Sequence, residues 1–166
     1  MRKISYLIEK LTAFFGKIAG VLVVALTLLI VYDAGMRYLF HEGSVALQEL
    51  EWHFYDLIFL LGLSYTLKHD KHVRVDIFYM RYSPKTKAVL NIISQIFLIL
   101  PFVALVVYVS WDFVAMSYAQ HEGSSDPGGL CCRYAIKSAV ILAFVLLGLQ
   151  SVSEIYKNFL KLKGEK

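Results

Sequence analysis

The stretch AVLNIISQIFLILPFVALVVYVSWDFVAMSYA, residues 88–119, decides the fold class of this chain. It contains one carboxylate, Asp112, and neither lysine nor arginine. About 20 mostly apolar residues are enough for a helix to cross the roughly 30 Å hydrocarbon core of a bilayer. The stretch is longer than an upright crossing needs, so we expect it to tilt, bend or project beyond the membrane. Pro101, near its middle, predicts a kink, because proline frees the carbonyl one turn before it.

Three further apolar stretches predict an all-α membrane protein with four transmembrane helices. Hydrophobic residues make up 58% of the 166 residues and charged residues 18%, whereas ordinary soluble domains are about 45–50% apolar. The second stretch is short, and it reaches a spanning length only if 44–51 extends it as helix, with Ser44 as N-cap. The chain 1–166 is therefore expected to be a single membrane domain. The expected spans are about 18–40, 45–67, 86–119 and 134–157.

The basic residues predict the orientation. Most of the 17 lysines and arginines lie in 1–17, 68–87 and 157–166, and the two remaining loops are poor in them. With four spans, these three segments fall on one side, which the positive-inside rule makes the cytoplasm. The sequence therefore predicts an N-in/C-in topology with both termini cytoplasmic. The net charge of +4 is spread over membrane ends and forms no single patch, so no nucleic-acid partner is expected.

The N-terminal segment 1–16 leaves two interpretations open. Its apolar residues recur at helical spacing, which is typical of an amphipathic helix lying on the membrane surface. The same pattern fits a direct extension of the first span. The first span ends without a small-residue cleavage site, so we expect it to be retained rather than removed as a signal peptide. The residues at helical spacing are Ile4, Leu7, Ile8, Leu11 and Phe15.

Three acids lie in or near the spans, where ionisable residues are costly and often functional. Asp33 precedes Arg37 by four residues, a spacing that predicts an ion pair within one helix. Asp56 and Asp112 both fall near the outer ends of their helices. Contact with a partner helix, or access to water, explains them better than a proton relay.

The histidines and cysteines predict no catalytic, cofactor or metal site. A haem-binding anchor needs histidines that face each other from different helices, and His53 is the only one near a span. The spacing of His69, Asp70 and His72 is too loose to predict a metal site. Adjacent cysteines rarely bridge, because the disulfide geometry strains the intervening peptide. Cys131 and Cys132 are therefore expected to be two small thiols at a helix entrance. No nucleophile–base set is evident, so we expect no enzyme.

The run ALQELEWHFYDLIFLLGLSYTLKHDKHVRVDIFY, residues 46–79, resembles the small membrane subunit of tripartite ATP-independent periplasmic (TRAP) transporters, the DctQ-like family. The later run HEGSSDPGGLCCRYAIKS, residues 121–138, is similar to one subgroup associated with oxo- and hydroxy-acid uptake. The adjacent cysteines depart from the pattern, which has a small residue or proline there. The resemblance covers about residues 15–158. The matching positions are Glu49, Trp52, Gly62, His72, Arg74, Asp76, Glu122, Ser124, Asp126, Pro127, Gly128, Gly129, Leu130, Lys137 and Gln150.

The resemblance implies a scaffold in the bacterial inner membrane that binds neither substrate nor cofactor. It would brace a large membrane subunit that imports an organic acid, an oxo- or hydroxy-carboxylate, with an ion gradient. A periplasmic substrate-binding protein would deliver the acid. The alternatives are a haem-binding anchor of a respiratory enzyme and a self-sufficient small exporter. The residues that the resemblance marks as contacts to partners or to membrane lipids are Glu49, Trp52, His72, Arg74, Asp76, Glu122, Asp126 and Lys137.

Overall fold

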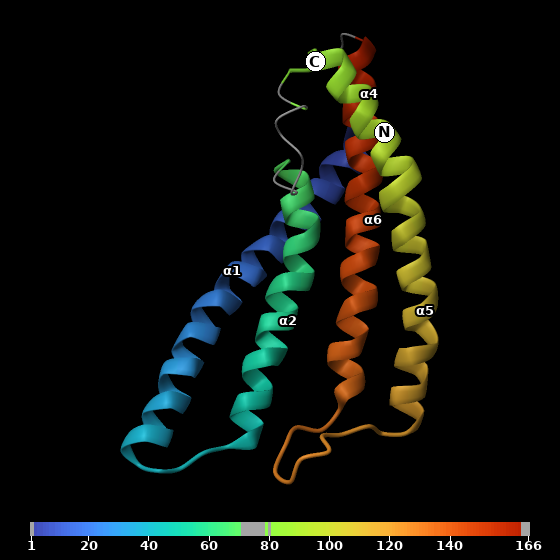
Figure 1. Cartoon of the computed structure of the whole chain (residues 1–166). Coiled ribbons are helices and arrows are strands. Elements are labelled where there is room, and N and C mark those ends of the chain that lie inside the picture. Colours follow the sequence, from blue (N-terminus) through green and yellow to red (C-terminus); the bar gives the residue numbers. More distant parts are fainter. Residues whose placement is uncertain (1, 71–78, 80, 164–166) are drawn as a thin grey trace.

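A computed structural model of the chain describes residues 2–70, 79 and 81–163. Over these residues the secondary structure is helical, with no strand, which confirms the all-α class. The helices, shown in Figure 1, are α1 (Arg2–Leu39), α2 (Val45–Lys68), α4 (Pro84–Ser94), the π-helical η1 (Gln95–Ile99), α5 (Leu100–Ala119) and α6 (Arg133–Lys163).

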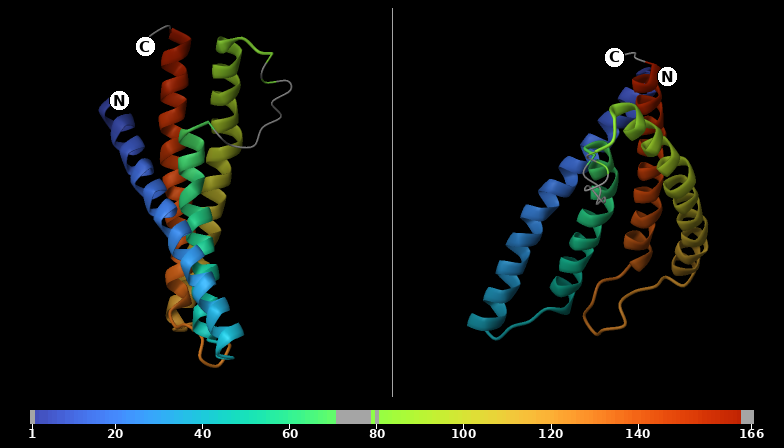
Figure 2. Two further views of the ribbon diagram at one scale, coloured as in Figure 1. Left: turned by 90° about the vertical axis from the view of Figure 1, so that its left-hand side faces the viewer. Right: turned by 45° about the horizontal axis from the view of Figure 1, so that its top comes forward.

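The helices stand side by side in the order α1, α2, α6, α5 (Figure 1). Helix α6 is central, since α1, α2, α4 and α5 all pack against it. Seen from the side, α2, α5 and α6 form a thin layer that α1 crosses at an angle (Figure 2). The first and last described helical ends, at Arg2 and Lys163, lie at the same end of the bundle (Figure 1).

Three stretches in the described part of the chain are long and apolar enough to cross a membrane: Arg2–Leu39, Pro84–Ala119 and Arg133–Lys163. Helix α2 is not among them, because Glu49, Glu51 and Asp56 lie in its first half and lower its hydropathy. The prediction of a spanning bundle is therefore met by three helices on their own composition. Whether α2 also spans depends on its packing against the other helices.

Helix α1 is continuous over 38 residues, with no break between the N-terminal segment and the first apolar stretch. The described part of the N-terminal segment and the first apolar stretch are therefore one helix, and the position of the membrane surface along it stays a prediction. One stripe of α1 packs inward: Ser5, Thr12 and Ala19 are buried at spacings of seven residues. A Cβ atom added to Gly16 on the same stripe would overlap the ring of Tyr65 on α2. The extension therefore packs on the bundle through small and polar residues.

The third apolar stretch changes form next to Pro101. Residues Gln95–Ile99 are π-helical, and the Leu100 amide bonds the carbonyl five residues back, at Gln95. Proline has no amide hydrogen, so Pro101 cannot donate the helical hydrogen bond to the carbonyl one turn back. The wider π turn before it accommodates this missing bond. The ribbon changes direction here (Figure 1). The bend expected at Pro101 thus takes the form of a π segment before it. At the start of α4, Ser83 Oγ accepts a hydrogen bond from the Thr86 amide and Pro84 occupies the first turn.

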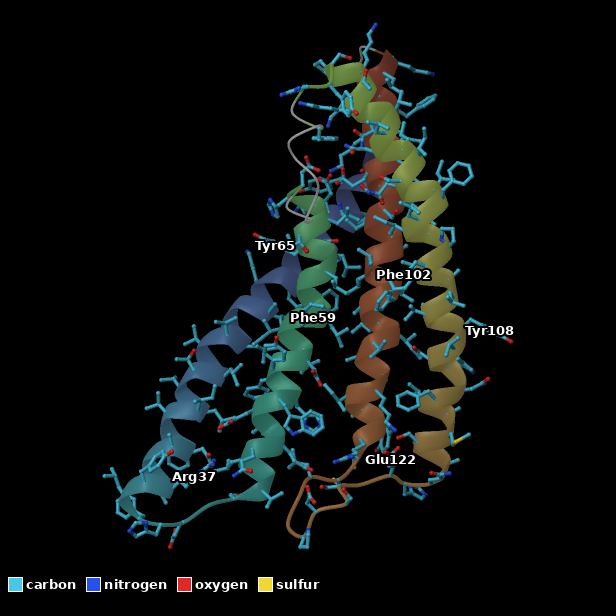
Figure 3. The ribbon with its side chains drawn as sticks, in the orientation of Figure 1. Arg37, Phe59, Tyr65, Phe102, Tyr108 and Glu122 are labelled. Carbon is cyan, nitrogen blue, oxygen red and sulfur yellow. The ribbon has the colours of Figure 1, made fainter. Side chains whose placement is uncertain are left out.

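The interior is more polar than the surface. Two small apolar clusters hold the helices together, Ala19–Leu61–Leu146 and Leu67–Val103–Leu147. The outer surface is rich in large apolar side chains, such as Tyr108, which points away from the bundle (Figure 3). This pattern suits a lipid environment, in which association depends on close packing and internal hydrogen bonds. The largest fully buried side chains are Gln150, Thr12, Ser64, Ser117, Ser151 and Ser153.

Candidate functional site

Glu49, one turn into α2, is the centre of the candidate site. Its side chain is only 6% exposed. One carboxylate oxygen accepts hydrogen bonds from Ser124 Oγ and, at 3.2 Å, from Arg133 Nη2. The other accepts the Leu130 amide at 2.5 Å. Hydrogen bonds to a charged acceptor are stronger than neutral ones. Glu49 therefore fixes the loop 120–132 and the start of α6 against α2.

Two glycines allow the loop to approach Glu49 so closely. A Cβ atom on Gly129 would collide with the Ser124 side chain and lie 2.8 Å from Glu49 Oε2. Gly128 has a φ of +82°, a conformation that side chains oppose. The turn therefore needs glycine at both positions. Gly128 is needed for its backbone conformation, and Gly129 is needed because a side chain there would not fit.

A second ion pair closes the same loop at its other side. Lys137 Nζ on α6 donates to Glu122, and the Lys137 ammonium lies 4.0 Å from the ring centre of Phe113 on α5. This donation by Lys137 holds the pKa of the Glu122 carboxyl below its usual value. The Glu122 carbonyl accepts the Arg133 amide at 2.9 Å. Figure 3 shows Glu122 where the loop meets the ends of α5 and α6.

Trp52 and Asp126 lie at the margins of this cluster. The Arg133 guanidinium lies 5.8 Å from the Trp52 ring centre, and the Trp52 ring stacks on His53. The Asp126 amide bonds Ser124 Oγ at 3.1 Å, while Asp126 itself is exposed. The structure therefore brings five of the eight residues marked by the resemblance to one end of the bundle. The other three, His72, Arg74 and Asp76, lie outside the described residues.

A cavity of about 320 Å³ opens beside this cluster, between α2, α5 and α6. Arg133 and Lys137 line it, and both are already paired with carboxylates, Glu49 and Glu122. The half-buried Asp56 also lines it and has no hydrogen-bond or ion-pair partner among the described residues. The cavity therefore has an excess of negative charge at Asp56. Its other lining residues are Trp52, Phe59, Leu60, Phe113, Ile136 and Val140.

The sequence interpretation missed a second polar network, at the opposite end of the bundle. Thr12 Oγ1 on α1 donates to Gln150 Oε1 on α6 at 2.9 Å, and Gln150 Nε2 donates to Glu154. Lys157 pairs with both Glu154 and Glu9. Ser5 and Ser153 hydroxyls lie 2.6 Å apart, and Ser151 Oγ donates to Gln95 on η1 at 2.5 Å. The available signal was the polar stripe Ser5, Glu9 and Thr12, at helical spacing on the face next to the apolar residues.

Asp33, Arg37 and His53 have hydrogen-bond partners within their own helices. Arg37 pairs with the buried Asp33 within α1, which confirms the spacing argument. His53 Nδ1 lies 2.5 Å from the Glu49 carbonyl of its own helix, so nothing in this arrangement favours the haem-anchor alternative. No group of three His, Cys, Asp or Glu residues in the described part of the chain could hold a metal ion. Asp112 is exposed near the end of α5.

Comparison with known families gives one match that covers most of the chain. A family model described as the DctQ component of tripartite ATP-independent periplasmic transporters matches residues 26–161. The matched region includes α2, α4, η1, α5, the Glu49 cluster and nearly all of α6. No curated protein matches the chain.

Proposed function

Because the chain belongs to the DctQ family, the small membrane component of TRAP transporters, we propose that it is the scaffold subunit of such a transporter. In this role it crosses the bacterial inner membrane four times with both termini in the cytoplasm. It braces the large permease subunit, which uses an ion gradient to import an organic acid, an oxo- or hydroxy-carboxylate. A periplasmic binding protein delivers that acid.

The observation that carries the scaffold role is that the buried polar groups bond mainly to one another. Thr12, Gln150 and Glu154 form one chain of hydrogen bonds, and Ser151 and Gln95 form another. Membrane transporters usually build substrate sites from broken helices whose free backbone groups and charges face a cavity. Internal pairing of this kind makes the α1–α6 contact rigid and leaves few groups for a solute.

The packing of α2 supports the fourth crossing. Its 24 residues give a length of about 36 Å at 1.5 Å per residue, enough to cross a bilayer. It lies between α1 and α6, each of which is apolar enough to span. A helix packed along two spanning neighbours shares their membrane depth. The acids Glu49, Glu51 and Asp56 then lie at the outer end, where Glu49 is already paired.

Asp56 supplies a specific contact for the large subunit. It lines a mostly apolar cavity and has no partner among the described residues, and its neighbours Arg133 and Lys137 are already paired with Glu49 and Glu122. A lysine or arginine from the large subunit would complete the pairing, and the aromatic walls would cover its aliphatic stem. We assign this cavity to the docking of that subunit.

Arg74, with His72 and Asp76, remains a proposed second contact at the cytoplasmic end. The arginine fork suits a lipid phosphate or a carboxylate, and the unit would lock the inner loop against the bundle or the large subunit. Arg74→Ala should then lower recovery of the two-subunit complex in detergent. Unchanged co-purification and uptake would remove this contact from the proposal.

Co-expression with the large subunit tests the Asp56 contact. Asp56→Asn should reduce co-purification, and Asp56→Lys should reduce it further, because it brings like charges together. Asp112→Asn is the matched control, since Asp112 is also near a helix end but is exposed. Equal recovery of the Asp56→Lys and unmodified complexes, with equal uptake of a labelled hydroxy acid, would refute the docking site.

The scaffold role itself is tested by reconstitution. Liposomes that hold this chain alone should show no flux of the labelled acid, and liposomes that hold the complex with the binding protein should show it. Flux through the chain alone would establish the exporter alternative.

A further inference from the structure

Cys131 and Cys132 form a close pair of thiols at the end of the loop, immediately before α6. Both side chains are exposed, and their sulfur atoms lie 3.0 Å apart. Neighbouring side chains diverge in a helix and in a strand. Here Cys132 has a φ of +66°, which is unusual for a residue with a side chain and accompanies the close approach of the two sulfurs.

The distance between the sulfurs suits covalent closure. A disulfide bond is about 2.05 Å long, so the two atoms must approach by only about 1 Å. Ring closure between adjacent cysteines is normally opposed by strain in the peptide between them. The backbone at Cys132 already departs from the common conformations. The backbone at Cys132 and the short distance between the sulfurs therefore favour closure of the ring.

The surroundings also favour one sulfur as nucleophile. Cys132 directly precedes the first residue of α6, and the positive end of a helix stabilises a thiolate. The hydrogen-bonded contact with Cys131, and secondly the one with Tyr134, lowers the pKa of Cys132, while the contact with Cys132 raises the pKa of Cys131. Cys132 is thus the attacking thiol and Cys131 the resolving one.

The pair lies between two groups that hold Glu49. The Leu130 amide, one residue before the pair, donates to Glu49 Oε2 at 2.5 Å. The Arg133 guanidinium, one residue after it, donates to Glu49 Oε1 at 3.2 Å. A change in the backbone between these two donors alters the distance between them. The Glu49 carboxylate then cannot keep its hydrogen bonds to both.

We propose that Cys131 and Cys132 are a redox-active vicinal dithiol, which closes to an eight-membered disulfide ring and thereby loosens the loop from Glu49. The oxidant is a small or protein disulfide. The Cys132 thiolate attacks one of its sulfurs, forms a mixed disulfide and releases the other sulfur as a thiolate. Cys131, as its thiolate, then displaces the second sulfur and completes the ring. The external disulfide gains two electrons and the two protons that the pair loses. This chemistry does not depend on the transport role.

Thiol labelling of the purified full-length chain tests ring closure. After reduction with dithiothreitol, denaturation in N-ethylmaleimide should add two labels per chain. After treatment with oxidised glutathione it should add none, and the intact mass should be lower by two hydrogens. Phenylarsine oxide, which bridges paired thiols, should bind only the reduced form.

Single-cysteine variants provide the control for this chemistry. Cys131→Ser lacks the resolving thiol and should retain glutathione on Cys132. Two labels on the unmodified chain after oxidation, or glutathione on both of its cysteines, would overturn the proposal.

The effect on Glu49 needs a separate measurement. Hydrogen exchange at the Leu130 amide should be about tenfold faster in the oxidised chain, because its bond to Glu49 opens more often. The doubly substituted chain, Cys131→Ser with Cys132→Ser, should show no difference between the two conditions. Equal exchange in oxidised and reduced chains would overturn the link to Glu49 even where the ring closes.

Discussion

Replacing Gln150 with leucine tests whether buried hydrogen bonds hold α1 against α6. The Gln150 side chain is fully buried, accepts a hydrogen bond from Thr12 Oγ1 at 2.9 Å and donates one to Glu154 Oε1 at 2.9 Å. Leucine has a similar volume and no polar atom. The substitution therefore removes both bonds and leaves the Thr12 hydroxyl buried without its acceptor.

The expected cost follows from the burial and geometry of the Thr12–Gln150 bond. Hydrogen bonds between membrane helices contribute about 0.6 kcal/mol on average and about 1.7 kcal/mol at most. Thr12 is 1% exposed and the distance is close to ideal. We therefore expect a coupling of about 1–1.7 kcal/mol between the two residues. Gln150→Leu alone also loses the bond to Glu154, so its total cost should be about 1.5–3 kcal/mol.

Unfolding by dodecyl sulfate in mixed micelles, followed by circular dichroism, gives the free energy of unfolding for each variant. Thr12→Val, Gln150→Leu and the double variant form a cycle whose difference is the coupling energy. Thr27→Val is the matched control, because Thr27 is exposed on the same helix and bonds only its own helix at the Val23 carbonyl. It should change stability by less than about 0.5 kcal/mol. A coupling of zero, or equal costs for Thr12→Val and Thr27→Val, would refute the reasoning.

Two further predictions concern close packing and pH. Gly16→Ala should destabilise the bundle relative to Gly20→Ala by about 1–3 kcal/mol. A Cβ atom at Gly16 would overlap the Tyr65 ring, whereas one at Gly20 would have no atom within 4 Å. Equal unfolding curves for the two variants would contradict this packing. The hydrogen bond from Lys137 lowers the pKa of Glu122 in the folded chain. The ion pair therefore contributes its full stability above about pH 4.3, the ordinary glutamate pKa. This contribution is lost as the pH falls through the lower pKa of Glu122 in the folded loop. Hydrogen exchange of the loop amides between pH 6 and pH 3 measures this loss of stability. The Glu122→Gln variant should lack the part of the pH dependence that comes from the ion pair.

The helices could be predicted well from the sequence because apolar length and caps are local properties. Helix α2 begins at Val45 and ends at Lys68, close to the expected 45–67. Helix α6 continues to Lys163, about two turns beyond the expected end, because its charged residues still face outward or pair with α1. Pro101 predicted where the third stretch bends, but the π form of Gln95–Ile99 depends on how η1 packs on α6.

The site was less predictable, because its contacts join distant parts of the chain. Glu49 meets Leu130 and Arg133 across more than 80 positions, and no spacing rule connects them. The resemblance marked Glu49, Glu122 and Lys137 as contacts to partners, whereas here they pair within the chain. Local patterns can indicate that a charge is buried, but its partner becomes known only from the packing.

Helices α2, α5 and α6 form the thin layer described above, which α1 crosses at an angle (Figure 2). Over the described residues these helices stand in a row and do not close into a ring (Figure 1). This layer has two broad sides, and we expect one to face a companion protein and the other to face lipid tails. A substitution on either side should therefore affect only one of these neighbours.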